Sequence, residues 1–329
     1  MLGGEYEAFR AEYEKPHRRG VRLNTLKCDA ETLARTLPFP LAPTPFSPLS
    51  YYAPEAVRMA SLPLYHAGAF YSQEPSASSA VTLLDPKPGE KVLDLCAAPG
   101  GKSTQIAALT GDCGLLWSNE VVRSRASALA SNLERMGVKN AVVSSVYPEV
   151  LAEKLEGYFD RVLVDAPCSG EGMFRRDPQA IAEWSPAHVE ACAARQLAIL
   201  GSAARCVREG GVLVYSTCTF SEEENEGVVR AFLRENPGFV LEKPDVAFGR
   251  PAYGVDAVRI FPMDGGEGHF AARFRRTAPN GYAARPYDEK PDRQTEAAAQ
   301  TFCASVFTDW KAERFARVRD RILLLHKGR

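Results

Sequence analysis

Short apolar runs alternate with longer amphipathic stretches between residues 91 and 217, and this alternation constrains the fold more than any other feature of the sequence. The apolar runs are Lys91–Cys96, Leu115–Ser118, Ala141–Ser144, Arg161–Asp165 and Gly211–Thr217, and helical patterns occupy about 101–110, 123–136 and 186–208. Strands that are apolar throughout are covered on both faces, which is typical of a parallel sheet between two layers of helices. Val255–Pro262 and His269–Arg275 add two closing strands. We therefore predict an α/β fold with a doubly wound, mostly parallel, seven-stranded sheet.

The sequence on either side of this core differs from it in composition. Residues 1–70 hold a basic stretch from Lys15 to Lys27 followed by seven prolines, which exclude a long helix, so we expect a small N-terminal lobe. The sheet domain then spans residues 71–276. Residues 277–300 are polar and predict a linker, while residues 301–329 carry seven lysines and arginines against three acids and indicate the start of a further module.

An acidic run follows the last apolar strand of the core. Ser221–Glu226 places a serine before four glutamates and one asparagine. A serine suits the N-cap of a helix, and acids in the first turn interact favourably with the helix dipole. The run therefore predicts a helix that starts here, with Ser221 as its N-cap and acids in its first turn.

Composition excludes several classes of protein. In 329 residues, 25% charged and 45% apolar side chains with a net charge of −1 exclude collagen-like, low-complexity and mostly disordered chains. No apolar run approaches the roughly 18 residues of a membrane span, and the polar N-terminus lacks the apolar core of a signal peptide. We expect a cytoplasmic protein. Its eight cysteines should then be thiols, and none has the spacing of a zinc site, so we expect no metal.

A glycine-rich loop, Cys96–Lys102, follows the first strand and precedes a helix, which suits a ligand held close to the backbone. A phosphate-binding P-loop requires glycine where Cys96 stands, so that pattern fails. The dinucleotide fingerprint requires glycine where Ala98 stands, so that pattern is incomplete. The remaining ligand is an adenosyl group without a pyrophosphate, whose carboxylate can use the N–H groups at the helix start.

An acid after the second strand is the partner that such a ligand needs for its ribose. Glu120 stands 20 residues after Gly100, as the ribose-binding acid does in Rossmann folds. The alternative is a solvated surface glutamate. Arg125, one turn into the next helix, can pair with Glu120 or with the ligand, or it can be an ordinary exposed arginine.

Two cysteines follow neighbouring strands, in Asp165-Ala-Pro-Cys168 and in Ser216-Thr-Cys218. Ligands of open α/β sheets bind outside the carboxyl ends of the strands, so both thiols, Asp165 and the glycine loop should converge on one crevice. A single cysteine at a strand end is usually a small buried apolar residue. The pair beside an acid favours chemistry instead.

The chemistry that fits is methylation of a pyrimidine at C5. S-adenosylmethionine is an electrophilic methyl donor, and pyrimidine C5 becomes nucleophilic only after addition to C6, for which a thiolate is the best suited side chain. Asp165 can take up charge at the N3 or N4 edge, and a second thiol can assist product release. These arguments do not order Cys168 and Cys218, because cytosine-C5 DNA methyltransferases attack with the cysteine of a Pro-Cys motif.

Four passages resemble the NOL1/NOP2/Sun family of RNA cytosine-C5 methyltransferases: Arg22–Lys27, Asp94–Lys102, Asp165–Gly172 and Ser216–Thr219. The resemblance runs from residue 1 to about 276 and implies a Rossmann-like S-adenosylmethionine-dependent methyltransferase domain. It implies that Cys218 is the nucleophile and that Cys168 helps release the product. It also implies that S-adenosylmethionine or its immediate surroundings are contacted by Cys96, Ala97, Ala98, Pro99, Gly100, Gly101, Lys102, Glu120, Arg125 and Asp165.

The sequence departs from the family at Ser144–Glu149, where the family often has an acid near the adenine. We therefore assign no adenine contact. Relatives of this type also continue into C-terminal RNA-binding modules, so residues 277–329 are expected to be a linker and the start of such a region in a shortened or truncated chain.

The expected substrate is RNA, and the target cytosine must leave its stack to reach a thiol in a crevice. We expect a monomer that methylates small-subunit (16S) ribosomal RNA, either free or in the small subunit. The alternatives are a transfer RNA cytosine-C5 methyltransferase and a non-catalytic ribosome-assembly factor of the same fold. Basic side chains expected to neutralise phosphates, or alternatively to form a solvated basic face, are Arg18, Arg19, Arg22, Lys27, Arg175 and Arg176.

Overall fold

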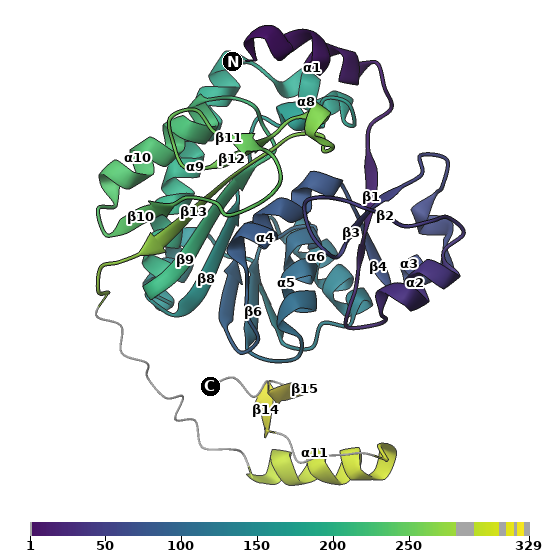
Figure 1. Ribbon diagram of the computed structural model, residues 1–329. Coiled ribbons are helices and arrows are strands. Elements are labelled where there is room, and N and C mark those ends of the chain that lie inside the picture. Colours follow the sequence, from purple (N-terminus) through teal and green to yellow (C-terminus); the bar gives the residue numbers. More distant parts are fainter. Residues whose placement is uncertain (1, 281–292, 309–313, 319–320, 326–329) are drawn as a thin grey trace. The chain divides into compact units, whose positions relative to one another are not determined.

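The computed structural model describes residues 2–280, 293–308, 314–318 and 321–325. Its contacts divide the chain into two units, Met1–Tyr282 and Ala283–Arg329. Figure 1 shows the larger unit as a twisted sheet between two layers of helices, with a small lobe formed by the N-terminal residues beside it. Within the described residues, no helix combines the length and the apolar character needed to span a bilayer.

Five neighbouring strands of the main sheet run parallel, in the order β7-β6-β5-β8-β9. Antiparallel strands then follow on the β9 side, where β13 pairs with β9, β10 and β12 pair with β13, and β11 pairs with β12. The bounds are β5 Lys91–Asp94, β6 Leu115–Asn119, β7 Ala141–Ser144, β8 Phe159–Asp165, β9 Val207–Thr217, β10 Phe239–Glu242, β11 Arg250–Pro251, β12 Val258–Ile260 and β13 His269–Arg276.

The predicted fold class is therefore confirmed, with one difference in strand number. The sheet has nine strands in place of the seven expected, because β10 and β11 were not predicted. Both lie at the antiparallel edge and are only four and two residues long. Strands this short carry too little apolar alternation to be recognised in a sequence.

Helices cover both faces of the sheet, as a doubly wound topology requires (Figure 1). One apolar core lies between the sheet and α4, α5 and α6, and the other between the sheet and α7, α9 and α10. The bounds are α4 Ser79–Leu84, α5 Gly101–Thr110, α6 Arg123–Met136, α7 Pro148–Lys154, α8 Pro178–Glu183, α9 Pro186–Cys206 and α10 Val228–Glu235. Three helices predicted from apolar spacing, α5, α6 and α9, agree with these bounds to within two residues.

The N-terminal lobe is a second, fully antiparallel sheet with the strand order β2-β3-β1-β4. Its last strand, β4, begins at residue 70, the last residue of the expected lobe, and continues to Gln73, so the lobe's sheet extends three residues beyond the expected boundary. Short helices and an apolar cluster that includes Val21, Leu33 and Phe70 complete it. The bounds are α1 Tyr6–Tyr13, β1 Arg19–Leu23, α2 Ala30–Thr36, β2 Ala42–Pro43, β3 Ser50–Ala53, α3 Pro63–His66 and β4 Phe70–Gln73.

Single-turn segments connect several of these elements. Five are 3₁₀ turns: η1 Gly3–Glu5, η2 Met59–Ser61, η3 Pro75–Ser78, η4 Glu171–Met173 and η6 Pro262–Asp264. The sixth, η5 Glu223–Gly227, is a π-helical turn that runs directly into α10. Glu224, Asn225 and Glu226 in this turn are fully buried. The helix predicted to start at Ser221–Glu226 does start there, and the backbone N–H of Glu224 donates to the hydroxyl of Ser221 at 3.3 Å. Glu224 and Glu226 are buried because they have partners inside the protein.

The second unit contains a helix, α11 Arg293–Val306, and a hairpin of β14 Arg314–Val318 and β15 Arg321–Leu325. The helix begins inside the segment 277–300, which was expected to be a linker throughout, because Gln294–Thr301 includes a run of alanines that favours helix. The part of that linker at residues 281–292 lies outside the described residues.

Arg22 joins the lobe to the sheet domain. Its side chain is 1% exposed, and its guanidinium donates to the carbonyl of Gly101 (2.6 Å), to the hydroxyl of Thr104 (2.6 Å) and to the side chain of Gln73. Burial lowers the pKa of Arg22 to about 9. The expectation that Arg22 neutralises RNA phosphates is therefore wrong. Its guanidinium donates to acceptors inside the protein and does not reach the surface.

Replacing Arg22 by methionine should therefore destabilise the protein. One buried acceptor and two partly buried acceptors lose their donor, so we expect the free energy of unfolding to fall by about 2–4 kcal/mol in urea titrations. The matched control is Lys27→Met in the same lobe, where an exposed side chain should change it by less than about 0.5 kcal/mol. Equal stabilities of the two variants would contradict this role.

Candidate active site

A cavity of about 450 Å³ opens at the carboxyl ends of β5, β8 and β9, and it is large enough for a small-molecule ligand. Its walls come from the glycine-rich loop, from β4 and from the first residues of β13. Of the catalytic and cofactor-binding residues predicted from the sequence, Gly100, Glu120 and Cys168 lie outside its lining. Those that line it are Cys96, Ala97, Ala98, Pro99, Gly101, Lys102, Arg125, Asp165 and Cys218.

Two glycines shape the loop at one end of this cavity. Gly100 has a φ of +108°, a left-handed conformation that residues with a Cβ rarely adopt, and it precedes the first turn of α5. Gly101 lies against β4, since a Cβ there would sit 3.4 Å from the ring of Tyr71. The loop therefore packs closely against the N-terminal lobe while its backbone remains open to the cavity.

Lys102 and Asp165 form an ion pair on the cavity wall, with 2.6 Å between Nζ and Oδ2. The hydroxyl of Ser216 donates to the other carboxylate oxygen at 2.7 Å. Burial alone would raise the pKa of Asp165, but the Lys102 ammonium and the Ser216 hydroxyl lower it below its ordinary value. Asp165 is therefore an anion at neutral pH and acts only as a hydrogen-bond acceptor.

Acidic side chains behind the loop suit the adenosyl ligand expected from the sequence. Glu120 is 5% exposed; it accepts from the backbone N–H of Val122 at 2.9 Å and lies 3.5 Å from Nη1 of Arg125. Asp94 is fully buried, and its Oδ1 has no hydrogen-bond partner among the described residues. Burial raises the pKa of Asp94 to about 7. A glycine cradle with carboxylates behind it and a cation at its mouth fits a ligand with a ribose and a charged amino-acid end.

The two cysteines at the strand ends face each other. Their sulfur atoms are 3.4 Å apart, although 50 residues separate them in the chain. A hydrogen bond to Cys218 and burial both raise the pKa of Cys168 well above its ordinary value, so Cys168 remains a thiol at neutral pH. Both side chains are partly exposed, and Cys218 lines the cavity beside Asp165.

Hydrogen bonds between the two cysteine-bearing loops fix this distance. The backbone N–H of Gly172 donates to the carbonyl of Cys218 at 2.9 Å, and the hydroxyls of Ser169 and Thr219 are 2.8 Å apart. Glu171 accepts from the N–H of Phe220 at 2.9 Å. The loops after β8 and β9 thus form one rigid pair.

Buried side chains that the sequence analysis did not identify support these loops from below. Glu224 accepts from the N–H of Ser169 at 3.0 Å and from the amide of Gln196 at 2.7 Å. Asn225 accepts from the hydroxyl of Thr217 at 2.6 Å and donates to the carbonyl of Thr219 at 3.0 Å, which fixes both neighbours of Cys218.

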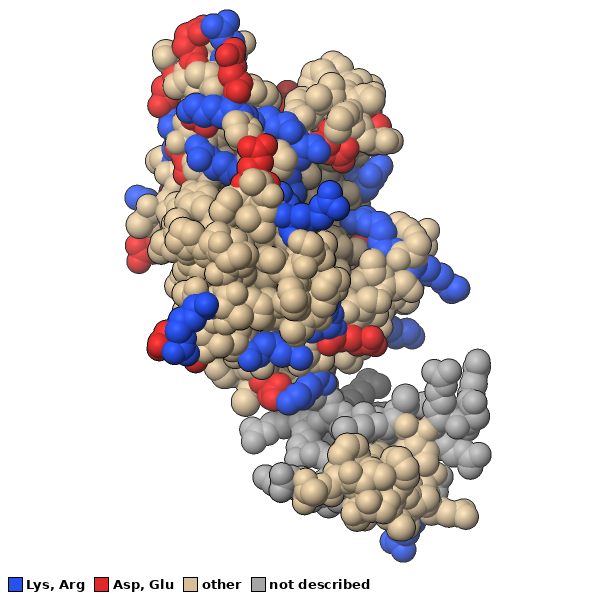
Figure 2. Space-filling model, turned by 90° about the vertical axis from the view of Figure 1, so that its right-hand side faces the viewer, with Lys and Arg blue, Asp and Glu red and all other residues tan. Residues whose placement is uncertain are grey.

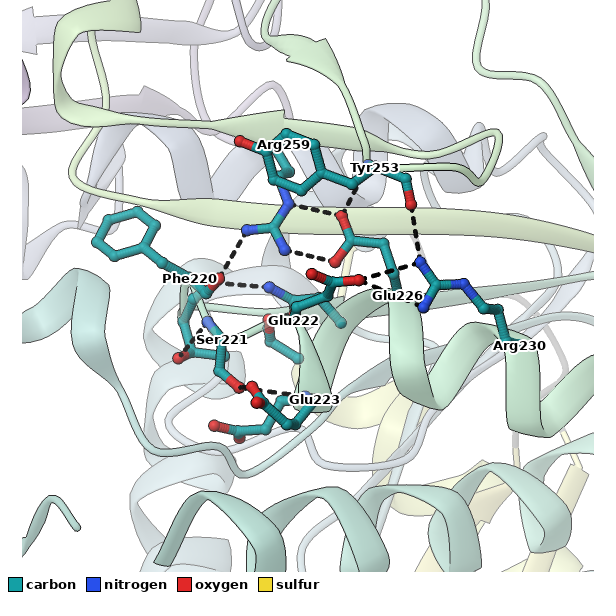
Figure 3. Close-up of polar contacts among 12 residues, drawn as sticks. Phe220, Ser221, Glu222, Glu223, Glu226, Arg230, Tyr253 and Arg259 are labelled. Carbon is teal, nitrogen blue, oxygen red and sulfur yellow. Dashed lines mark hydrogen bonds and ion pairs between the residues drawn. The ribbon is translucent and has the colours of Figure 1, made fainter. Parts of the chain in front are cut away.

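A buried ion pair between Arg259 and Glu226 supports Phe220, which follows Thr219 in the loop after β9. Figure 3 shows Arg259 between Glu226 and the carbonyl of Phe220, to which it donates at 2.8 Å. Its Nε donates to Glu226 at 2.7 Å, and the ring of Tyr253 lies 4.9 Å from the guanidinium. A lone arginine within the apolar run from Val258 to Phe261 is the sequence signal that could have revealed this pair, because buried arginines require an acid.

His269 is a further cavity residue that sequence reasoning missed. It begins β13, lines the cavity and is 3% exposed. Its Nε2 lies 3.9 Å from Oδ1 of Asp165. In the described part of the chain, the cavity included, no three His, Cys, Asp or Glu side chains gather in a group that could hold a metal ion.

The arginines and lysines predicted to contact RNA fall into two groups. Arg18, Arg19 and Arg176 line a second cavity of about 390 Å³, which shares Arg176 with the first, and Lys27 is exposed. Figure 2 shows that lysines and arginines form a band across the upper half of the face that the lobe presents. Arg175 does not belong to this group.

The expectation that Arg175 contacts RNA phosphates is wrong. Its side chain is 5% exposed and pairs with Glu267 at 3.1 Å. The same guanidinium donates to the carbonyls of Lys15 and Pro16, both at 2.7 Å. Arg175 therefore ties the loop after β8 to the N-terminal segment and has no free donor facing solvent for a phosphate.

The contact between Gly172 and Cys218 leads to a test of the site. A Cβ at Gly172 would lie 2.9 Å from the carbonyls of Cys218 and Gly268, so Gly172→Ala must displace backbone. We expect a loss of about 1–3 kcal/mol in the free energy of unfolding and of about a hundredfold in kcat for methyl transfer. Gly201→Ala on α9, which meets nothing within 4 Å, is the control and should leave both unchanged or improved. Full activity of Gly172→Ala would show that the loop contact does not position the thiol.

Two family models match the chain. Residues 81–275 match "16S rRNA methyltransferase RsmB/F", and residues 1–75 match "N-terminal domain of 16S rRNA methyltransferase RsmF". The second match agrees with two of the passages most similar to RsmF in the sequence, Met1–Lys27 and Phe70–Ser76, and the third, Phe174–Pro178, lies within the first match.

Named relatives and solved structures lead to the same family. Ribosomal RNA small subunit methyltransferase F of Klebsiella pneumoniae is 36% identical over 342 residues, which cover 97% of this chain and 72% of that protein. A methyltransferase homolog protein from Pyrococcus horikoshii is 30% identical, with a TM-score of 0.72 over 84% of this chain and 92% of its own. NSun6 from the same organism, solved with SFG, is 25% identical, with a TM-score of 0.75 over 84% of this chain and 96% of its own. The chain therefore belongs to the RsmB/F family of 16S rRNA methyltransferases, which use S-adenosylmethionine as the methyl donor.

Proposed function

We propose that this enzyme methylates C5 of a cytosine in small-subunit ribosomal RNA and that Cys218 and Cys168 carry the reaction. The observation on which this rests is the 3.4 Å between the two sulfur atoms beside Asp165, at the edge of one cavity. The substrate is inferred from the relatives, which are named ribosomal RNA small subunit methyltransferase F. A ribosomal RNA substrate also agrees with the cytoplasmic location expected from the sequence. One chain supplies all of these side chains, so the proposal requires neither a metal ion nor a second copy.

S-adenosylmethionine supplies an electrophilic methyl group to this cavity. The backbone of the loop around Gly100 and Gly101 is placed to hold its amino-acid end, and Glu120 is the candidate partner for its ribose. The structure of NSun6 with SFG, an analogue of the same donor, supports the assignment by similarity of fold.

The chain's own residues would activate the cytosine. The Cys218 thiolate adds to C6, which makes C5 nucleophilic, and the ionised Asp165 accepts a hydrogen bond from the N4 amino group. Once C5 carries the methyl group, a base takes its proton, directly or through water, and cleavage of the sulfur–C6 bond releases the product and frees Cys218. We assign assistance in this release to Cys168, whose sulfur lies 3.4 Å from that of Cys218.

The lining of the cavity supports the order of the two cysteines. Cys218 lines the cavity beside Asp165, whereas Cys168 lies outside the lining, with its sulfur 3.4 Å from that of Cys218. Cys218 thus suits the role of nucleophile and Cys168 that of the neighbouring thiol that assists release.

Substitution of each cysteine should separate these roles. Cys168→Ser should trap a covalent RNA adduct through Cys218, because addition proceeds and release is impaired. Cys218→Ser should give neither adduct nor methylated product. Denaturing gels of the enzyme with small-subunit RNA, together with bisulfite mapping, measure both. The opposite pattern would reverse the roles, and the absence of adduct and of methylation on any ribosomal RNA would refute the activity.

The cavity shared by the lobe and Arg176 is the proposed path of the RNA backbone. Arg18 and Arg19 each donate to protein groups with part of their guanidinium, to Glu12 and to the carbonyls of Glu55 and Val57, whereas Arg176 is exposed beside the catalytic cavity. Arg176 is therefore the arginine best placed to meet a phosphate next to the target nucleotide.

Arg176→Gln should weaken RNA binding in a salt-dependent manner. Loss of one phosphate contact reduces the slope of log Kd against log salt by about one. The control is Arg234→Gln on α10, where a side chain that is 73% exposed should leave the slope unchanged. Filter binding between 50 and 200 mM salt, a range in which such contacts weaken strongly (about 10³-fold or more for several contacts), measures both variants. Equal slopes would remove Arg176 from the RNA path.

Two competing functions give different results in simple measurements. A non-catalytic assembly factor would bind RNA in calorimetry without any affinity for S-adenosylmethionine. A transfer RNA methyltransferase would give the Cys168→Ser adduct with transfer RNA and none with small-subunit RNA. The intact set of Asp165, Cys168 and Cys218 argues against the first.

A further inference from the structure

His269 is buried in the wall of the catalytic cavity without a hydrogen-bond partner of normal geometry. Neither ring nitrogen is bonded to any residue in the described part of the chain, although the side chain is only 3% exposed. Its polar surroundings are the backbone of Gly268, the Lys102 ammonium and the Asp165 carboxylate. An unpaired buried polar group is costly, and one that lines a cavity can be satisfied by a bound ligand or by water.

The position of His269 in the sheet brings it level with the nucleophile. β13 is antiparallel to β9, and Phe270 pairs with Thr217. The preceding residue, His269, is therefore level with Cys218, at the edge where the target base must lie to be attacked. Both residues line the same cavity.

The ring at this position is neutral. Burial and the Lys102 ammonium lower the pKa of His269 to about 3, although the Asp165 carboxylate opposes the shift. A neutral imidazole has one N–H donor and one acceptor nitrogen. Since Nε2 is the nitrogen 3.9 Å from the Asp165 carboxylate, the negative charge favours the tautomer with its proton on Nε2.

Asp165 and His269 then present an acceptor and a donor side by side. The edge of cytosine offers a matching pair, the N4 amino donor next to the N3 acceptor. Uracil has the reverse order, an O4 acceptor next to an N3–H donor, and would offer neither protein group a matching partner on the base. We propose that Nε2–H of His269 donates to N3 of the target cytosine while Asp165 accepts from its N4 amino group, so that the two residues together read the base.

This inference rests on the proposed cytosine-C5 activity, and it adds a role during the reaction. Addition of the Cys218 thiolate to C6 moves negative charge onto the ring, including N3. A donor aimed at N3 binds this form more tightly than the unreacted base, so it should raise kcat as well as affinity. A histidine that only fills space would do neither.

Replacement of N3 in the substrate provides the test. The RNA is a synthetic oligonucleotide that spans the cytosine trapped by Cys168→Ser on small-subunit RNA, with either cytidine or 3-deazacytidine at the target. 3-Deazacytidine has C–H in place of N3 and cannot accept the bond. Single-turnover methylation gives the ratio of the two rates for the wild type, His269→Phe, His269→Leu and His269→Gln.

We expect both apolar variants to lower the ratio of cytidine to 3-deazacytidine rates by about tenfold relative to the wild type, the size of one hydrogen bond. The intrinsic reactivity of the two bases cancels in this comparison. His269→Gln keeps an N–H donor and should retain the ratio to within about threefold. Binding of S-adenosylmethionine, measured by calorimetry, should be unchanged in all variants and confirms their fold.

Two results would overturn the inference. The first is an unchanged ratio in whichever apolar variant folds, and the second is a ratio for His269→Gln as low as that of the apolar variants. Methylation of the cytidine oligonucleotide by the wild type reports on the proposed function alone. An active wild type with an unchanged ratio therefore rejects only the role of His269, whereas an inactive wild type rejects the proposed function and this role with it.

Discussion

The parallel pairing of β8 with β9 is the constraint on which the site depends. Asp165 is in register with Ser216, so the residues that follow each strand leave the sheet at the same edge. Cys168 comes three residues after one partner and Cys218 two residues after the other, and the loops are then joined by hydrogen bonds between Gly172, Cys218 and their neighbours. A shift in register would separate the sulfur atoms. A change in the conformation of one loop alone would not bring the two sulfur atoms back to 3.4 Å.

Buried charge supports this arrangement at three levels. Lys102 with Asp165 sets the charge on the cavity wall, Arg259 with Glu226 fixes the loop after Cys218, and Arg22 holds the glycine loop against the lobe. Each ion or ion pair is costly to bury, and each uses its hydrogen bonds on backbone or side-chain groups that border the site. These buried charged groups therefore contribute mainly by fixing the positions of the groups that they bond, and less to the free energy of folding. An apolar side chain could fill the same space but could not hold a carbonyl group in place.

The fold was largely predictable from the sequence, because apolar spacing fixed the long elements α5, α6 and α9 and the parallel strands between them. Edge strands such as β10 and β11 were not, since pairing with a neighbour defines them more than their own residues do. The motif residues converge as their positions at strand ends implied. The burial of charged side chains could not be predicted. Nothing in the local sequence distinguishes buried Arg22 from exposed Lys27, and buried Glu224 pairs with Gln196, which lies 28 residues away in sequence.

The contact made by Arg22 has a consequence for how such proteins can be recombined. The guanidinium belongs to β1, while its acceptors belong to β4 and to the first turn of α5, so one hydrogen-bonded group crosses the junction between residues 1–75 and residues 81–275. The two segments match separate family models, but the hydrogen bonds of Arg22 make each segment depend on the other. In a chimera that exchanges the lobe between relatives, the glycine-rich loop should keep its conformation only if Arg22, Gln73 and Thr104 are all present.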